Sequence, residues 1–464
     1  MLFQYRAHTR LLSCSLAWLG LFAAVGCASL PPVPGAGGPR WLSLLAPHHV
    51  LLSDQPEAQA QKTSAQIELQ HAGLCSVAFH CAAPAQKLRV IALQDAGQFE
   101  QLYGSEAAGA FSPELIYEPQ LVLSANTRGA SALLNRVLTT LIARQTLGVL
   151  PAWLLSGIES YFESAHFDTA GAFVVGDVVR RHVELLKTRP RIRAEALLTQ
   201  PPSAANDALF EASAWLLVHY LQSERRTDFG ALLTSIGTGQ ALDVAFRETF
   251  PDLSPELLDG LLDRYLQAGN YLTQSKQVGL QPPAAAVVPL SDADVYSLRA
   301  EVAATCSPCD AAQRERSQKF LALALQADPT HVRATILRAQ PNELIKSHPE
   351  NWLSWVHAAY TQPERACTSE LRDHLQAIAP DSPHTLSLAA TCAQQTGQTD
   401  QALALSKRAF SAYPISPRIT LSHARILHAA GACAELAQLL EQASESPGRA
   451  SMASLGECVS RRGP

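Results

Sequence analysis

The chain has 464 residues, of which 47% are hydrophobic, 17% are charged and 6% are aromatic, and it contains ten cysteines. A chain of this length and apolar content can bury sizeable cores, which excludes disorder as its main state. Its 36 Lys and Arg residues against 41 Asp and Glu residues give a formal net charge of −5, with no basic run. Binding to a nucleic-acid backbone needs clustered positive charge, so we expect no DNA or RNA partner.

The first 26 residues have the features of a signal peptide. Arg6 and Arg10 precede an apolar stretch from Leu11 to Val25, which is shorter than the roughly 20 residues of a bilayer span. The sequence LFAAVGC, which ends at Cys27, resembles the lipobox of bacterial lipoproteins. In a lipobox, small residues precede a cysteine that is acylated and becomes the mature N-terminus.

This resemblance implies that residues 1–26 are removed and that Cys27 carries the lipid. Several acyl chains on one cysteine attach a protein stably to a membrane, whereas a single chain is marginal. By the same resemblance, Ala28 in place of an aspartate favours the outer membrane. We therefore expect a lipid-anchored protein of the bacterial cell envelope that faces the periplasm. An ordinary secreted protein and an uncleaved anchor are the alternatives.

Two proline-rich stretches without periodicity divide the rest of the chain. Residues 27–39 are a Pro/Gly tether with nothing to bury, and residues 276–289 have the composition of a linker. We expect one domain over residues 40–275 and a second domain over residues 290–464.

The first domain begins with mixed patterns and ends with helical ones. Strand patterns cover His49–Ser53, Lys87–Leu93 and Gln120–Ser124, and a helical pattern covers Glu57–Phe79. Everything after Ala130 has the pattern of helices separated by turns. The expected fold is therefore α+β, with a small sheet followed by helices.

The last third of the chain repeats with a period of 34 residues. It resembles the tetratricopeptide repeat, a helix-turn-helix unit that buries its apolar face by stacking on its neighbours. The resemblance implies an all-α solenoid over residues 290–464, whose concave face binds a protein or peptide partner. The residues related by the 34-residue spacing are Pro349, Pro383 and Pro417, then Pro380 and Pro414, and Gly397 and Gly431.

Eight cysteines remain once Cys14 is removed with the signal peptide and Cys27 is lipidated. An even number of cysteines in an oxidising compartment favours disulfides. Two pairs share a separation of 25 residues, which joins adjacent helices in an array of helical hairpins. The C-x-x-C sequence at Cys306 is also the motif of redox catalysis or of half a zinc site, and these alternatives stay open. The expected pairs are Cys75–Cys81, Cys306–Cys309, Cys367–Cys392 and Cys433–Cys458.

The segment from Leu88 to Leu266 resembles gluzincin metallopeptidases of the peptidase-MA-like kind. The likeness rests on the strand LRVIAL, on a helix that begins near Ser131, and on the sequence PAWLLSGIESYFE at residues 151–163. In that family one helix carries H-E-x-x-H, and the next supplies a glutamate just before a glycine. Histidines at i and i+4 share one helix face and bind zinc, while the glutamate between them activates water. The resemblance implies a zincin-like α+β fold.

All four zinc-site positions are replaced in this chain. Counted back from Pro151, the H-E-x-x-H motif falls on residues 140–144. Threonine and serine hydroxyls are poor zinc ligands, a leucine has no base, and an arginine puts a positive charge where the metal would bind. We therefore expect that the zinc site is lost and that no cofactor is bound. The replaced positions are Thr140, Leu141, Arg144 and Ser156.

Two hypotheses about function follow. We favour a non-catalytic binding or scaffold lipoprotein, whose repeats bind a partner and whose former cleft holds a strand-like peptide along the Gln120–Ser124 edge. The alternative is a peptidase-like hydrolase with a rebuilt, non-standard active site. Its candidate residues are Glu159, Glu163, His166 and His182, whereas His219 lies in an apolar run and is expected to belong to the core.

Overall fold

The computed structural model describes most of the chain after the expected signal peptide. The described residues are 30–79, 81, 84, 86–104, 107–124, 127–148, 150–200, 207–279, 281–305, 309–338, 342–442, 455 and 458. The signal peptide, Cys27 and Cys306 lie outside them. Within this part of the chain, no helix combines the length and the apolar composition that crossing a membrane requires.

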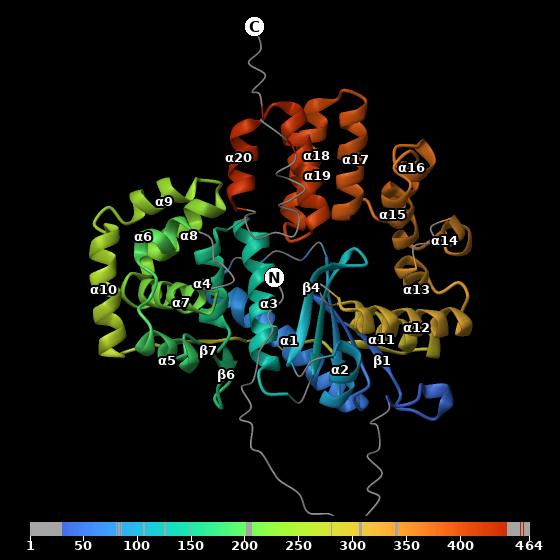
Figure 1. Cartoon of the computed structure of the whole chain (residues 1–464), viewed down its shortest axis with the longest axis horizontal. Helices are drawn as coiled ribbons and strands as arrows, with labels where there is room; N and C mark the ends of the chain where they lie inside the picture. Colours follow the sequence, from blue (N-terminus) through green and yellow to red (C-terminus); the bar gives the residue numbers. More distant parts are fainter. Residues whose placement is uncertain are drawn as a thin grey trace, which may run out of the picture.

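A six-stranded sheet lies at the centre of the molecule (Figure 1). Its strands are β1 (Leu42–Leu45), β2 (His49–Ser53), β3 (Leu88–Leu93), β4 (Gly109–Leu115), β5 (Glu118–Ser124) and β9 (Ala286–Pro289). Their order is β4-β5-β3-β2-β1-β9. The three strands β2, β3 and β5 are parallel, and β1, β4 and β9 run antiparallel to their neighbours. A smaller sheet contains β6 (His166–Phe167), β7 (Ala172–Val175) and β8 (Gln274–Gln277).

Ten helices of the described chain precede β8. They are α1 (Glu57–Val77), α2 (Ala96–Tyr103), α3 (Ala130–Leu147), α4 (Ala152–Phe162), α5 (Arg180–Thr188), α6 (Ala194–Thr199), α7 (Asp207–Glu224), α8 (Arg226–Gly237), α9 (Leu242–Thr249) and α10 (Pro255–Ala268). Helices α5 to α10 gather on one side of the sheet, at the left of Figure 1.

Ten further helices of the described chain follow β9. In Figure 1, α11 to α16 lie to the right of the sheet, and α17 to α20 lie above it. They are α11 (Asp292–Ala304), α12 (Ala311–Ala327), α13 (Val332–Leu337), α14 (Asn342–Ser347), α15 (Trp352–Thr361), α16 (Ser369–Ile378), α17 (Pro383–Gln395), α18 (Thr399–Ala412), α19 (Pro417–Ala430) and α20 (Cys433–Gln442).

The central strands are buried on both faces, because successive residues point into two different cores. Val90 and Leu121 pack with α1, α3 and α4, whereas Ile91 and Val122 pack with α2 and α11. Parallel strands that are covered on both faces read as continuous apolar runs, as in the LRVIAL sequence of β3. This double burial explains why β2, β3 and β5 were visible in the sequence as strands.

The 34-residue spacing marks equivalent points of two helical hairpins. Pro383 and Pro417 are the first residues of α17 and α19, where a missing backbone N–H costs nothing. Gly397 and Gly431 follow the same helices with left-handed φ angles of 76° and 72°. The turn residues therefore recur with the helix pairs α17–α18 and α19–α20. Pro349 does not begin a helix, since α15 starts at Trp352.

Three expectations about the strands need correction. Residues 276–289 are not simply a linker, because β8 ends at Gln277 and β9 pairs with β1 within the main sheet. Strands β6 and β7 also follow Ala130, where we expected only helices. The segment Gln120–Ser124 is not an edge, since β5 lies between β3 and β4. The strand at that edge is β4, whose Ser112, Pro113 and Glu114 hide its pattern in the sequence.

Among the residues that the structure describes, three cysteine pairs lie at disulfide distance. Their S–S distances are 1.94 Å for Cys75–Cys81, 2.10 Å for Cys367–Cys392 and 2.13 Å for Cys433–Cys458. The 25-residue pair at Cys367 joins the start of α16 to the end of α17. Of the expected pair Cys306–Cys309, the structure describes only Cys309.

Gly157 allows α4 and α7 to approach closely. A Cβ atom at this position would lie 2.5 Å from Val218 Cγ2 and 2.6 Å from the backbone oxygen of Ala214. We expect Gly157→Ala to lower the free energy of unfolding by about 1–3 kcal/mol, because the two helices must separate. Thermal and urea unfolding of the purified protein measure this change.

Gly230 in α8 is the matched control, because it is exposed and a Cβ atom there meets nothing within 4 Å. Gly230→Ala should stabilise the protein by about 0.5–1 kcal/mol through the higher helix propensity of alanine. Equal effects of the two substitutions would contradict the close packing of α4 on α7.

Candidate functional site

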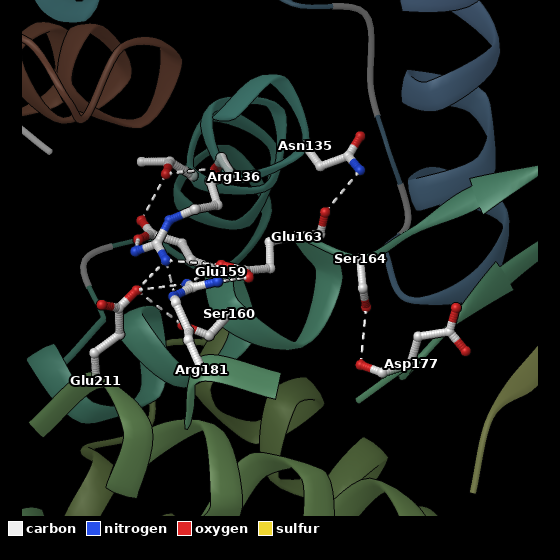
Figure 2. A network of polar contacts seen from close by, with 10 residues as sticks. Asn135, Arg136, Glu159, Ser160, Glu163, Ser164, Asp177, Arg181 and Glu211 are labelled. Carbon is white, nitrogen blue, oxygen red and sulfur yellow. Dashed lines mark hydrogen bonds and ion pairs between the residues drawn. The ribbon is translucent and has the colours of Figure 1, made fainter. Parts of the chain in front are cut away.

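A buried arginine on α3 is surrounded by carboxylates from two other helices (Figure 2). The side chain of Arg136 is 4% exposed. Its Nη2 lies 3.4 Å from Glu159 Oε2 on α4, and its Nη1 lies 3.1 Å from Oε2 of Glu163, the residue that caps the C-terminal end of α4. The same Nη1 also contacts the carboxylate of Glu211 on α7. One guanidinium group therefore ties three helices together.

A second arginine closes this cluster from α5. Arg181 contacts both carboxylate oxygens of Glu163, and its Nη2 lies 3.5 Å from Glu211 Oε1. Three carboxylates and two guanidinium groups leave one net negative charge when all five groups are ionised. We call Arg136, Glu159, Glu163, Arg181 and Glu211 the arginine–glutamate cluster.

Helix periodicity places these side chains on facing surfaces. Thr140 lies one turn after Arg136, and its hydroxyl donates a hydrogen bond to Glu159 Oε1 at 2.6 Å. On α4, Ser160 lies between the two glutamates on the same face, with its Oγ 3.4 Å from Arg136 Nη1. Asn135 fixes the end of α4, since its Nδ2 donates to the backbone oxygens of Glu163 and Ala165. The polar face of α3 therefore begins at Arg136. This is one turn before Thr140, the first motif position obtained by counting back from Pro151.

Burial and pairing set the charges in and around the cluster. Burial alone would raise the pKa of Glu211, but Arg136, His182 and Arg181 outweigh it and hold this pKa at about 2. Burial raises the pKa of Glu159, although Arg136 and the hydrogen bond from Thr140 oppose the shift. Burial lowers the pKa of His182 to about 3, so this imidazole is neutral at pH 7.

The four replaced zinc-site positions do not meet at one point. Thr140 joins the cluster, and Ser156 shares the face of α4 that carries Glu159, although no hydrogen bond places it against Arg136. Leu141 instead lines a cavity beside β3, and Arg144 lines a groove next to the later helices. The charge of Arg144 still helps to lower the pKa of Glu159.

The alternative catalytic residues are also only partly brought together. Glu159, Glu163 and His182 lie in or beside the cluster, and His182 is 2% exposed. The side chain of His166 is 48% exposed and lies 3.4 Å from Asp177 instead. His219 is fully buried, with Nδ1 2.9 Å from the Tyr265 hydroxyl and Nε2 2.9 Å from the backbone oxygen of Gly176. It is a core residue with both ring nitrogens paired.

Three members of the cluster are not among the residues predicted from the sequence. These are Arg136, Arg181 and Glu211. A signal for Arg136 does exist, because it is the one charged residue in the first half of α3. No comparable signal links Glu211, which is 75 residues away from Arg136 in the chain.

Among the described residues, two glutamates of the cluster and the neighbouring His182 are close enough together to ligate one metal ion. Glu163, His182 and Glu211 each place a ligand atom within 4.8 Å of the others, a set that suits a divalent cation. Both glutamates already contact Arg136 and Arg181. A cation would have to compete with two guanidinium groups, so these residues do not fit a resident metal.

A second donor group lies at the end of α1. His71, Cys75 and Cys81 have ligand atoms within 4.8 Å of one another. The two sulfur atoms are bonded to each other, however, and a disulfide sulfur is a poor metal ligand because the thiolate is the ligating form.

The strongest resemblance to a catalytic constellation lies elsewhere, in α1 and β2. Ser64 Oγ is 3.0 Å from His49 Nε2, and His49 Nδ1 is 2.9 Å from Glu68 Oε1, which is the order of groups in a serine hydrolase triad. Ser64 is only 2% exposed, and His49 is fully buried. No substrate carbonyl can reach this hydroxyl, so the three residues serve to fasten α1 to the sheet.

The free space next to the arginine–glutamate cluster differs between its two sides. Glu163 and Arg181 line a groove of about 920 Å³, whereas the space beside Arg136 and Glu159 is very small. A cavity of about 20 Å³ separates Phe111 of β4 from α3 and α4. This volume holds about one water molecule and no peptide. It is lined by Phe111, Leu133, Arg136, Val137, Thr140 and Glu159.

Comparison with protein-family models, with curated proteins and with solved structures found no match to this chain. The site therefore has to be interpreted from its own geometry. That geometry is a buried, charge-paired cluster with almost no free space beside Arg136 and Glu159.

Replacing Arg136 tests whether it compensates the buried carboxylates. Arg136→Met leaves Glu159, Glu163 and Glu211 with only Arg181, and we expect a loss of about 3–5 kcal/mol in stability at pH 7. Without Arg136 the pKa values of the carboxylates rise, so protonation at pH 4 relieves the repulsion and the loss becomes smaller there. Denaturant unfolding of both proteins at pH 4 and pH 7 measures the difference.

The wild-type protein, in contrast, loses stability as the pH falls. Because the pKa of Glu211 is depressed from 4.5 to about 2, its stabilising contribution is complete above pH 4.5 and is lost as the pH falls towards 2. Arg247→Met is the control, since Arg247 forms an exposed pair with Asp243. It should leave the unfolding midpoint unchanged at both pH values. A pH-independent loss in Arg136→Met would show that packing, and not charge, is what the arginine provides.

Proposed function

We propose that this chain is a lipid-anchored, non-catalytic binding protein of the bacterial cell envelope. Its first part is a metallopeptidase-like domain that has lost its zinc, and its later helices are tetratricopeptide-like repeats that bind a protein or peptide. The observation that carries the proposal is Arg136, whose guanidinium lies among three glutamates one helical turn before Thr140, the first of the replaced zinc-ligand positions.

The size of the cavity supports the same conclusion. Peptide hydrolysis needs a substrate carbonyl, a water and a polarising group within about 3 Å of one another. The cavity between Phe111 and Arg136 is about 20 Å³, which cannot hold these groups together. Glu163 and Arg181 also line a larger groove, but there the two side chains are already paired with each other. The scaffold is thus suited to a structural or binding role.

A groove beside the first residues of β4 is a better place for a ligand. It has a volume of about 920 Å³, and its walls include Ala108, Arg128 and Arg180. Since β4 is the edge strand, an extended segment entering this groove would find the unpaired side of the sheet beside it. The charged residues of the lining are Arg128, Arg180 and Arg181 against Glu100 and Glu163, and this net positive charge favours an acidic segment.

A rebuilt hydrolase is the second candidate, and one observation favours it. Glu163, His182 and Glu211 are close enough to share a metal ion if Arg136 and Arg181 move away. In that hypothesis the metal supplies Lewis acidity, and these three side chains hold it. The two candidates differ in a property that is simple to measure.

Metal analysis of the protein secreted into the periplasm and purified without chelators tests the proposal. We expect well under 0.1 zinc per chain and no cleavage of a mixed peptide library. About one zinc per chain, lost in Glu163→Gln and His182→Ala together with peptidase activity, would overturn the non-catalytic proposal. Glu195→Gln, on the surface helix α6, serves as the matched control, because it removes a carboxylate outside the cluster.

A further inference from the structure

The turn that joins β4 to β5 has an unusual backbone. Leu115 pairs with Glu118, which leaves Ile116 and Tyr117 as a two-residue loop. Their φ angles are 49° and 65°, in the left-handed region that such loops normally fill with Asn-Gly. A β-branched residue there is strained, and strain of this kind persists only where surrounding contacts hold it. The contacts that hold this turn come from the later helices.

The ring of Tyr117 lies in an aromatic pocket between α15 and α17. It stacks on Tyr360 with the centroids 5.4 Å apart and the planes at 20°, and it meets the ring of His384 edge-on at 5.5 Å. Its hydroxyl lies 2.9 Å from His357 Nδ1. Tyr117 is 5% exposed, so the pocket encloses nearly the whole side chain.

The backbone of the turn is also recognised. Nε2 of His384 donates to the backbone oxygen of Tyr117 at 2.9 Å, and its Nδ1 accepts from the Tyr360 hydroxyl at 3.0 Å. Only the neutral imidazole can accept at Nδ1 while it donates from Nε2, and burial lowers the pKa of His384 to about 4. Tyr413, which directly follows α18, also contacts the turn: its hydroxyl donates to the backbone oxygen of Pro113 at 2.6 Å.

The start of α19 binds the carboxylate of Glu114. Ser416, which caps this helix, donates to Glu114 Oε2 at 2.7 Å, and the backbone N–H of Arg418 lies 3.3 Å from the same oxygen. Arg418 Nε is 3.2 Å from Glu114 Oε1. A carboxylate at a helix N-terminus is favoured by the helix dipole and by its free N–H groups.

Arg418 connects the two halves of the pocket. Its guanidinium carbon lies 5.4 Å from the ring centroids of both Tyr117 and Tyr360, a distance suited to cation–π attraction. One arginine thus contacts both the acid and the aromatic ring of the turn. Stacking, charge pairing and hydrogen bonds to the backbone are the means by which proteins bind peptides.

We propose that α15, α17 and α19 form a binding site for a turn that presents a carboxylate and, three residues later, a tyrosine, and that residues 113–118 of this chain occupy it as an internal ligand. The external partner is then a protein with an acidic–aromatic turn of the same chemistry, which binds by displacing this segment. The inference rests on the proposed binding role of the later helices, and it names the chemistry they bind.

The test is competition between the internal turn and an added one. The probe is a fluorescently labelled peptide with the sequence SPELIYEP, residues 112–119, flanked by two added cysteines that close it through a disulfide. The protein is the full mature chain without its lipid. In Glu114→Ala/Tyr117→Ala the site is vacated, and we expect at least tenfold tighter binding of the probe than in the wild type. In the wild type the tethered turn competes at a high effective concentration. Fluorescence anisotropy measures both affinities.

Variants on α19 identify the site. Adding Arg418→Ala to the vacated protein should weaken binding of the probe at least tenfold, because the acid and the ring lose their shared partner. Adding Arg425→Ala, an exposed arginine of the same helix, should not change it. A second probe carries Gln in place of Glu114 and Leu in place of Tyr117. If the vacated protein binds both probes equally, or if vacating the site does not raise the affinity for the first probe, the inference is overturned.

Folding of the vacated protein is checked by circular dichroism and thermal unfolding. If it does not fold, Glu114→Gln/Tyr117→Phe retains the shape of the turn and removes its charge and hydroxyl, and a gain of at least threefold in probe affinity is required. Failure of every variant to bind overturns this inference alone. The metal content of the protein and the charge balance around Arg136 would be unaffected.

Discussion

The pairing of Arg136 with buried glutamates is the interaction on which the first half of the molecule depends. Bringing a guanidinium and three carboxylates out of water costs several kcal/mol per ion, and only close mutual pairing offsets this cost. The three glutamates come from α4 and α7, so these helices have to sit where they can reach α3. Gly157 permits the required approach of α4 to α7 by removing a Cβ atom that would clash. Charge balance and close packing thus select one arrangement of α3, α4 and α7. This arrangement leaves a cavity of only about 20 Å³ between Phe111 of β4 and Arg136.

The two halves of the chain are joined at the second apolar face of the central sheet. The central strands expose apolar side chains on both faces, and the second face is covered by α2 together with α11, which follows the expected domain boundary. The charges at this junction are paired in the same manner. Glu301 of α11 is fully buried and accepts hydrogen bonds from Arg89 of β3 and from Arg333 of α13. The sheet is therefore incomplete without helices that lie some 200 residues later in the chain.

Sequence patterns predicted the parts of this fold whose burial is regular. Strands β2, β3 and β5 and helix α1 were expected within a few residues of their observed ends, because double burial gives unbroken apolar runs. The recurring Pro and Gly residues likewise marked the hairpins from α17 to α20. Strand β4 was missed because an edge strand tolerates Ser112, Pro113 and Glu114. Arg136, Arg181 and Glu211 of the arginine–glutamate cluster were missed because the family motif directed the count to Thr140 and Arg144. Its partners lie on separate helices, and no spacing in one sequence reveals such a meeting.

Strand β4 connects the two regions discussed above, and its shape explains how. Phe111 faces the small cavity in front of Arg136, whereas Glu114 and the turn beyond it enter the pocket of α15, α17 and α19. The register of β4 against β5 shifts between Ser112 and Leu115, so the strand bends between these two contacts. A bulge re-aims the residues that follow it without disturbing those before it. The first half of β4 can therefore keep the cavity closed while its end engages helices from the far part of the chain.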